Sequence, residues 1–224
     1  MTNMDMDGQM EKDSTLKRIE AEKLIAVVRM TGDWEVIKKT LQALAGGGVT
    51  VIEITTSVPD AVNIVRYLAN SVDKNYVVGA GTVLDEHSAL AMIEAGAEFI
   101  VSPAVIEDVI YAANRAGVPV FPGALTPTEI WEARRLGADA VKVFPASLFG
   151  PSYLSALSGP LKGIPLIPTG GLDLDNLSGY LRAGAFALGV GGNLIDAYAV
   201  GDGNWKKVES NAAAYVRAVK EAVR

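Results

Sequence analysis

The chain has 224 residues, half of them hydrophobic, so it can bury one sizeable core. It contains no cysteine, which excludes disulfides, thiolate metal sites and a cysteine nucleophile. Lys and Arg number 20 against 26 Asp and Glu, a net charge of -6 without a basic stripe, which disfavours a nucleic-acid partner. No apolar run reaches membrane-spanning length and no signal peptide is evident, so we expect a cytoplasmic protein that does not enter a membrane.

The chain begins with a polar stretch from Met1 to Asp13 that is rich in Met and Asp. Such a segment offers little apolar surface to bury, and we predict a mobile tail over residues 1–13. The remaining residues, 14–224, are expected to form one catalytic domain.

A short pattern recurs along that domain: a helix-like segment, a glycine and then an apolar run. Glycine supplies the left-handed residue that ends a helix, and a continuous β-branched run is typical of a strand buried on both faces. The runs close the segments LAGGGVTVIEIT, EAGAEFIVSP, RAGVPVFPG, LGADAVKVFPA and RAGAFALGVGG. Three more strands are predicted in LIAVVR (24–29), YVVGAGT (76–82) and PLIPTGG (165–171), which makes eight.

The segments between the strands have helical patterns. DWEVIKKTLQAL has Asp33 as a candidate cap and places four apolar residues on one face: Trp34, Ile37, Leu41 and Leu44. TPTEIWEARRLG offers Thr126 as N-cap, Pro127 at the first helical position and Glu129 to complete a capping box.

Eight strand–helix units favour a closed barrel over an open doubly wound sheet, which would need a switch point that the uniform repeat does not suggest. We therefore predict an α/β fold, a single (β/α)8 TIM barrel with an extra N-terminal helix. In such barrels the chemistry lies at the C-terminal ends of the strands. The residues there are Arg29, Glu53, Thr55, Thr82, Ser102, Pro103, Pro122, Gly123, Lys142, Phe144, Thr169, Gly170, Gly171, Gly191, Gly192 and Asn193.

Lys142 lies between two valines in an apolar strand, and Glu53 lies in another apolar strand. Burial disfavours both charged forms, so it would favour a nucleophilic amine on Lys142 and a carboxyl group suited to proton transfer on Glu53. The alternatives are a lysine whose ammonium reaches solvent and a carboxylate that serves only as its counter-ion. Position alone does not decide between these interpretations.

Two glycine pairs follow the seventh and eighth strands, in PTGG (168–171) and GVGGN (189–193). In barrels these loops often bind phosphate through backbone N–H groups, although a single pair usually marks only a tight turn. GAGT would present the hydroxyl of Thr82 to a small carboxylate. His87, the only histidine, is interpreted as a solvated residue in a first helical turn, and no ligand cluster favours a metal.

Taken together, the segments IAVVR, GGVTVIEIT, VGAGTVL, FIVSP, PGALTPTE, KVFPA and PTGG resemble one family, the 2-keto-3-deoxy-6-phosphogluconate (KDPG) and 4-hydroxy-2-oxoglutarate (KHG) aldolases. The resemblance spans about residues 16–220. It implies a class I aldolase without a cofactor or metal, a homotrimer of barrels, and reversible cleavage of the keto acid phosphate to pyruvate and glyceraldehyde 3-phosphate.

The resemblance also implies roles for single residues. Lys142 would form the Schiff base with the C2 carbonyl, and Glu53 would be the general acid/base. Thr82 and Thr169 would flank the pyruvyl unit, and Phe144 would pack against its carbon skeleton. The phosphate site would comprise Gly170, Gly171, Gly192 and Asn193, and Arg29 would be the basic residue that ends the first strand.

Two positions depart from the family pattern. Ser57 stands where some members carry an arginine, and Asn193 stands where many carry serine. Both concern the acceptor half of the substrate, so the same chemistry on 4-hydroxy-2-oxoglutarate or on 2-keto-3-deoxy-6-phosphogalactonate is an alternative. A phosphate-binding barrel isomerase or decarboxylase would need further aspartates or a metal. A non-catalytic or engineered barrel scaffold would not need to retain Lys142, Glu53 and both glycine loops.

Overall fold

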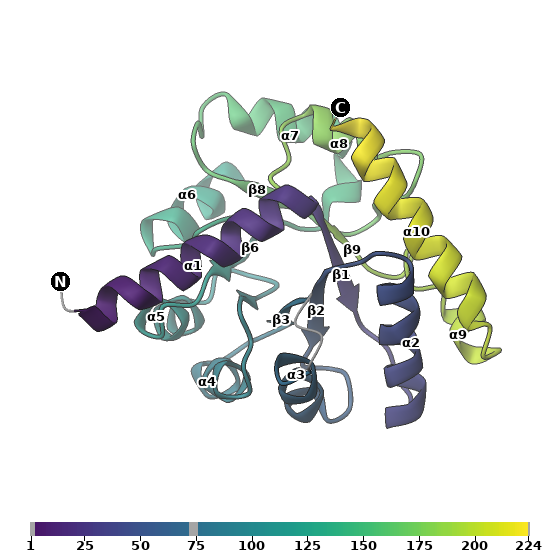
Figure 1. Ribbon diagram of the computed structural model, residues 1–224. Helices are drawn as coiled ribbons and strands as arrows, with labels where there is room; N and C mark the ends of the chain where they lie inside the picture. The colour runs from purple at the N-terminus through teal and green to yellow at the C-terminus, as the bar shows by residue number, and fades with distance from the viewer. Residues whose placement is uncertain (1–2, 72–75, 224) are drawn as a thin grey trace.

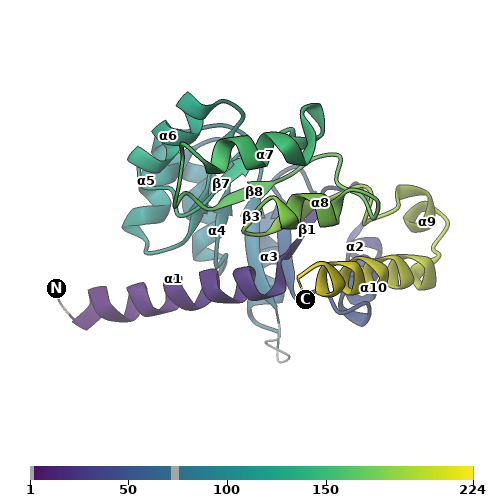
Figure 2. The ribbon, with the colours of Figure 1, turned by 90° about the horizontal axis from the view of Figure 1, so that it is seen from above.

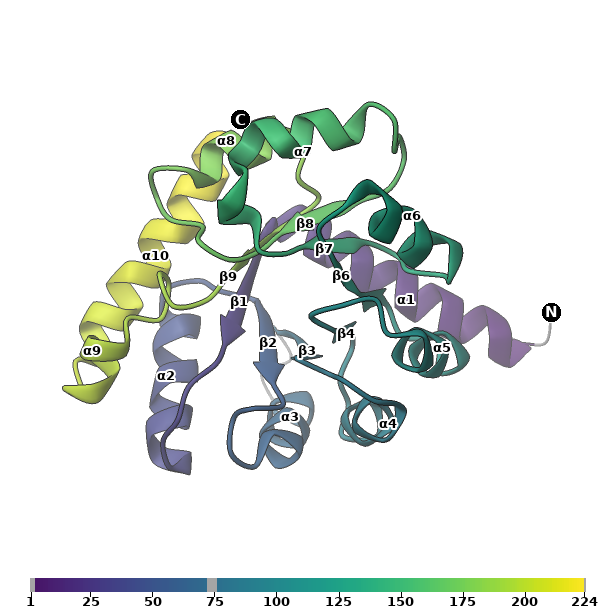
Figure 3. The ribbon, with the colours of Figure 1, turned by 180° about the vertical axis from the view of Figure 1, so that it is seen from behind.

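The computed structural model describes residues 3–71 and 76–223, which form an α/β fold whose parallel strands curl into a half-barrel (Figures 1 and 3). The strands are β1 (Leu24–Val28), β2 (Val51–Thr55), β3 (Val77–Gly81), β4 (Ile100–Val101), β5 (Val120–Phe121), β6 (Gly123–Ala124), β7 (Val141–Val143), β8 (Leu166–Pro168) and β9 (Leu188–Val190). They pair in the orders β5-β4-β3-β2-β1-β9 and β6-β7-β8.

Helices surround the strands (Figure 3). They are α1 (Asn3–Glu22), α2 (Trp34–Gly46), α3 (Ala61–Ala69), α4 (Glu86–Glu94), α5 (Glu107–Arg115), α6 (Pro127–Arg135), the 3-10 turn η1 (Ala146–Leu148), α7 (Gly150–Ser158), α8 (Leu177–Arg182), α9 (Ala197–Gly201) and α10 (Trp205–Ala222). None of the helices in the described ranges is long and apolar enough to cross a bilayer.

The fifth predicted strand is divided in two. Pro122 separates β5 from β6, and proline has no N–H group with which to continue a hydrogen-bonded ladder. Its carbonyl still accepts a hydrogen bond of 2.9 Å from the backbone N–H of Lys142. A second break lies between β8 and β9, where the described chain has only the isolated bridge of Thr169 with Gly189. With both breaks the described strands form two sheets, although the sequence pattern predicts eight strands in one.

Two apolar layers pack against the strands. One lies between strands and helices, and the other fills the space that the strands enclose. The inner layer includes Ile19 of α1, which is fully buried, and the rings of Phe99 and Phe121, whose centroids are 5.5 Å apart. Because Ile19 and Leu16 reach this layer, α1 covers the end at which the strands begin (Figure 2).

The predicted tail, residues 1–13, overlaps the first helix. Residues 3–13 belong to the same helix as residues 14–22, and residues 1–2 lie outside the described part. Within the helix, Lys12 Nζ lies 3.0 Å from Asp139 Oδ1 and 3.2 Å from Asn114 Oδ1. The sequence pattern did not extend a helix over residues 3–13 because this polar segment has no continuous apolar face. The mobility of residues 1–13 stays a prediction.

The predicted helix caps are confirmed. The side chain of Asp33 accepts a hydrogen bond of 3.0 Å from Val36 N, and Thr126 and Glu129 form the capping box behind Pro127. Of the four apolar residues predicted on one face of α2, Ile37, Leu41 and Leu44 are buried. Trp34 is exposed at the first turn and packs edge-to-face against Tyr67 of α3.

Candidate active site

Lys142 and Glu53 face one another inside the curled strands. Lys142 is the middle residue of β7 and 5% exposed, and Glu53 is the middle residue of β2 and 3% exposed. Their Nζ and Oε1 atoms are 3.9 Å apart, which is close enough for charge attraction but too long for a direct hydrogen bond. Glu53 Oε1 has no hydrogen-bond partner among the described residues. A buried oxygen of this kind is costly in a purely structural role, so the pair is a candidate for chemistry.

The space for this pair depends on glycines of the neighbouring strands. In the register of β2 and β3, Glu53 lies beside Gly79 and Thr55 lies beside Gly81. A Cβ atom on Gly81 would overlap Glu53 Oε1 and lie 2.5 Å from its Cδ atom. Glycine within a strand often marks such a close approach. Gly81 therefore lets the Glu53 carboxylate lie against the backbone of β3.

Arg29 and Thr82 meet at the ends of β1 and β3. Arg29 Nη2 donates a hydrogen bond of 2.9 Å to Thr82 Oγ1. Thr82 has a φ of 57°, a left-handed conformation that is rare for a β-branched residue and is often found at functional sites. The guanidinium group of Arg29 is exposed and can reach an anionic ligand.

Phe144 connects Lys142 with the turn after β8. Its ring centroid is 5.3 Å from Lys142 Nζ, and its ring is 38% exposed. A Cβ atom on Gly170 would lie 3.2 Å from Phe144 Cε2, so the ring lies over this turn. Phe144 thus forms an apolar wall between the amine and the glycine loop.

The glycine turns after β8 and β9 lie side by side. Gly170 and Gly171 have φ values of 91° and 76°, which only glycine adopts readily. Asn193 Nδ2 donates a hydrogen bond of 2.9 Å to Leu172 O and so links the two loops. In the described chain, the N–H groups of Gly170, Gly171 and Gly192 donate no hydrogen bond, so they are available to an anion.

Thr169 lies just before the first of these turns. It is buried, forms a parallel bridge with Gly189, and its hydroxyl donates a hydrogen bond of 3.3 Å to Ile167 O. A Cβ atom on Gly189 would lie 3.0 Å from Thr169 Cγ2, so this glycine also leaves room for a polar side chain. The predicted site residues thus lie within or directly after five strands, β1, β2, β3, β7 and β8, and in the loop after β9.

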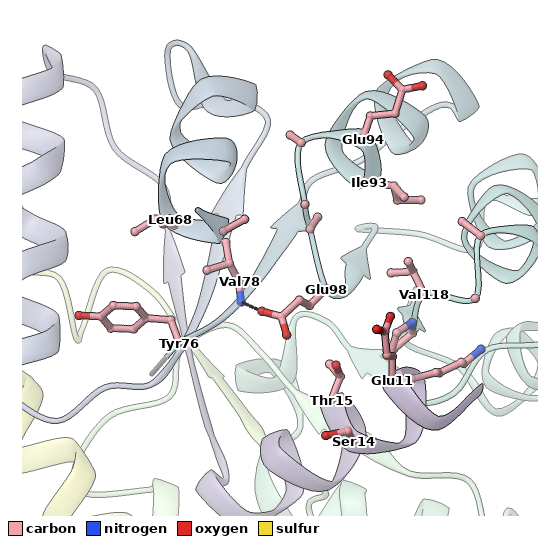
Figure 4. A pocket seen from close by; sticks show the side chains of 18 of the residues that line it. Glu11, Ser14, Thr15, Leu68, Tyr76, Val78, Ile93, Glu94, Glu98 and Val118 are labelled. Atoms are coloured by element: carbon pink, nitrogen blue, oxygen red, sulfur yellow. Dashed lines mark hydrogen bonds between the residues drawn. The ribbon is translucent and has the colours of Figure 1, made fainter. Parts of the chain in front are cut away.

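A separate cleft of about 750 Å³ lies at the opposite end of the strands, beneath α1 (Figure 4). Thr15 of α1, Tyr76 before β3 and Glu98 before β4 line it, and Glu98 Oε1 accepts a hydrogen bond of 3.1 Å from Val78 N. None of the predicted site residues lines this cleft. Its position at the start of the strands contrasts with the strand ends, where barrel enzymes carry out their chemistry.

Two features of the site were missed in the sequence. Gly81 lies in the predicted third strand but was given no role, although the alternation of Val77, Gly79 and Gly81 along β3 is the pattern of side chains facing one side. Thr56 was not singled out, yet its hydroxyl donates a hydrogen bond of 2.8 Å to Thr82 O. No sequence signal marks this second contact.

Comparison with known proteins gives concordant relatives. Residues 15–211 match the family model described as KDPG and KHG aldolase. A 2-dehydro-3-deoxy-phosphogluconate aldolase of Pseudomonas aeruginosa is 39% identical over 169 residues, which are 75% of this chain and 76% of the relative. A 2-dehydro-3-deoxy-6-phosphogalactonate aldolase of Escherichia coli is 33% identical over 202 residues, 90% of this chain and 96% of the relative.

A solved structure of KDPG aldolase from Legionella pneumophila has a TM-score of 0.80 and 27% identity, and the match covers 89% of this chain and 97% of that one. It holds pyruvate captured at low pH as a covalent carbinolamine intermediate.

Proposed function

The chain belongs to the KDPG and KHG aldolase family, and we propose that it cleaves 2-keto-3-deoxy-6-phosphogluconate reversibly to pyruvate and glyceraldehyde 3-phosphate, with Lys142 as the Schiff-base residue. The observation that carries the proposal is the buried pair of Lys142 and Glu53, 3.9 Å apart. The covalent carbinolamine of the Legionella relative supports an amine nucleophile. As a family member the chain is an aldolase, and aldolases are lyases.

The reaction begins at the amine of Lys142. Its lone pair attacks the C2 carbonyl of the substrate, and the carbinolamine loses water to give a cationic imine. When the C4 hydroxyl loses its proton, the C3–C4 bond breaks, the aldehyde leaves, and the bonding electrons move into the imine to give an enamine. Protonation at C3 and hydrolysis then release pyruvate and restore Lys142.

Glu53 is proposed as the group that moves the protons. Its carboxylate faces Lys142 Nζ, and its Oε1 atom has no hydrogen-bond partner within the described residues. It can therefore give a proton to the departing water of the carbinolamine and take one from the C4 hydroxyl, directly or through a water molecule. Burial of both groups keeps bulk solvent away from the enamine.

The two ends of the substrate are proposed to bind at separate subsites. Thr82 and Thr169 flank the pyruvyl unit, with the hydroxyl of Thr82 directed at the carboxylate and Arg29 beside it. Phe144 packs against the carbon skeleton. The phosphate binds to the free N–H groups of the glycine turns, together with the Asn193 loop: Gly170, Gly171, Gly192 and Asn193. Holding both ends fixes the scissile bond near Lys142.

The residues around the acceptor half of the substrate decide between this keto acid and its two alternatives. Ser57 stands at the position where some family members have arginine. Its Oγ atom is 2.9 Å from Thr55 Oγ1. Since the Thr55 hydroxyl donates to Val28 O at 3.1 Å, Ser57 donates to Thr55 and adds no cation to the loop. Cleavage of 4-hydroxy-2-oxoglutarate and of the 6-phosphogalactonate epimer remain the alternatives, since relatives are named for each of these activities.

We also propose that the strands close into one eight-stranded barrel, with α1 as the extra helix at its base. The bridge between Thr169 and Gly189 joins β8 to β9, and Asp139 N donates a hydrogen bond of 3.1 Å to Val120 O between β5 and the start of β7. These bonds support closure at both edges where the two sheets meet.

A cytoplasmic homotrimer is the proposed assembly. Trp131, Leu148 and Phe149 are all more than half exposed, which is unusual for large apolar side chains and favours a contact between subunits. Sedimentation equilibrium tests this: a mass of three chains is expected, and a monomer at micromolar concentration would contradict it.

The substrate assignment is tested by measuring pyruvate release. We expect the highest kcat/KM for 2-keto-3-deoxy-6-phosphogluconate among the three keto acids, with no release by Lys142→Ala. A higher kcat/KM for either alternative would reassign the substrate and leave the Schiff-base chemistry intact. Release by Lys142→Ala at the wild-type rate would overturn the mechanism.

A further inference from the structure

Thr82 holds a backbone conformation that needs support. Its φ of 57° puts a β-branched side chain in the left-handed region, a strained conformation for such a residue. Such a conformation persists only where neighbouring groups fix it. Thr82 is the residue proposed above to bind the substrate carboxylate, so whatever fixes its backbone also fixes that hydroxyl.

Thr56 supplies this support through two hydrogen bonds. Its backbone N–H donates to Gly81 O at 2.8 Å, and its hydroxyl donates to Thr82 O at 2.8 Å. The carbonyl of Gly81 belongs to the peptide plane before the Thr82 Cα atom, and the carbonyl of Thr82 belongs to the plane after it. The orientation of these two planes defines φ and ψ of Thr82. One residue therefore holds both planes around the strained position.

The side chain of Thr82 is oriented from the other side by Arg29. Because Thr82 Oγ1 accepts the N–H of Arg29 at 2.9 Å, the hydroxyl hydrogen is free to donate elsewhere. Among the described residues, no acceptor for that hydrogen is present at Thr82. A substrate carboxylate would accept a hydrogen bond from this hydroxyl, and a charged acceptor makes a stronger hydrogen bond than a neutral one.

We propose that Thr56 is a positioning residue for carboxylate binding: it keeps Thr82 in the left-handed conformation that aims its hydroxyl at the pyruvyl end of the substrate. The inference rests on the proposed aldolase function. It also predicts where the effect will be found. Thr56 follows β2 by one residue but touches neither Lys142 nor Glu53 through any hydrogen bond of the described chain, so binding of the carboxylate should weaken while the bond-breaking step is spared.

The test is trapping of the pyruvate adduct with borohydride at increasing pyruvate concentration. Thr56→Val keeps the shape and removes the hydroxyl donor, and Thr56→Ser restores the donor. For Thr56→Val, the pyruvate concentration for half-maximal adduct should rise about 3- to 10-fold, the effect of one lost hydrogen bond, with kcat for cleavage changed less than about twofold. Thr56→Ser should stay within about twofold of the wild type on both measures.

Thr40→Val is the matched control. Thr40 donates a similar hydrogen bond of 2.9 Å to a backbone carbonyl, Val36 O, but does so inside α2. This variant should leave half-saturation by pyruvate unchanged. Circular dichroism and thermal melting show whether each variant folds. If Thr56→Val does not fold, Thr56→Ala is measured in its place and judged by the same criteria.

The outcomes separate two kinds of failure. If wild-type protein gives no adduct, the proposed function fails. If wild-type protein gives an adduct and the folded Thr56 variant has unchanged half-saturation, the positioning role fails while the aldolase function stands. A loss of kcat without a change in half-saturation would also overturn the positioning role, because it would indicate a general disturbance of the site.

Discussion

Replacing Gly81 by alanine should disable the site without a change in any polar group. The backbone of Gly81 is outside the left-handed region, so alanine meets no conformational barrier there. Its Cβ atom, however, would overlap Glu53 Oε1 and lie 2.5 Å from Cδ and 2.7 Å from Cγ. Carbon atoms in contact are normally about 3.5–4.0 Å apart, so the carboxylate must move by about 1 Å. Glu53 is 3% exposed and cannot move into solvent.

The magnitude follows from that displacement. A catalytic group misplaced by about 1 Å can cost about 100-fold in rate, and overpacking of a core costs about 1–3 kcal/mol in stability. We therefore expect kcat of Gly81→Ala to fall about 100-fold, while the variant still unfolds cooperatively in urea with a free energy lower by about 1–3 kcal/mol.

The control for this variant is Gly201→Ala at the end of α9, where an added Cβ atom meets nothing within 4 Å. It should retain the kcat of the wild type. A kcat of Gly81→Ala within about threefold of the wild type would refute the argument, since the carboxylate could then be displaced without consequence.

Two further predictions concern single groups. Glu53→Gln should lower kcat by at least about 100-fold, the usual contribution of a general acid/base, and pyruvate release at the wild-type rate would contradict its role. Burial raises the pKa of Tyr215 to about 12, against about 10 in an unfolded chain. The unfolded phenol ionises first, so stability is lost as pH rises from about 10 to about 12, by roughly 3 kcal/mol at 1.36 kcal/mol per pH unit. In urea unfolding, Tyr215→Phe should lose less stability than the wild type over this range, and an equal loss in both proteins would contradict the assignment.

The sequence predicted the pairing of Lys142 with Glu53 although they lie 89 positions apart in the chain. The prediction rests on two features of the sequence pattern. Both residues lie in apolar strands, and the strands of the repeat run parallel, so their ends must share one face. The capping box of α6 was predictable for a similar reason, because it depends on residues three positions apart.

Other features depend on contacts that no local pattern encodes. The hydrogen bond from Asn193 to Leu172 O and that from Thr56 to Thr82 O follow from the conformations of two loops, which single residues do not specify. The helical conformation of residues 3–13 has a similar origin, since Lys12 pairs with Asp139, far away in the sequence. The sequence predicts which residues lie at the site, while these contacts define how the structure arranges them.

Lys142 is proposed to form a covalent bond to the keto acid. Borohydride reduction in the presence of pyruvate, followed by peptide mass analysis, tests this bond. We predict one pyruvate-derived adduct, on the peptide that contains Lys142, and none in Lys142→Ala. Wild-type protein without an adduct, or an adduct that persists on another lysine in the variant, would contradict the role of Lys142.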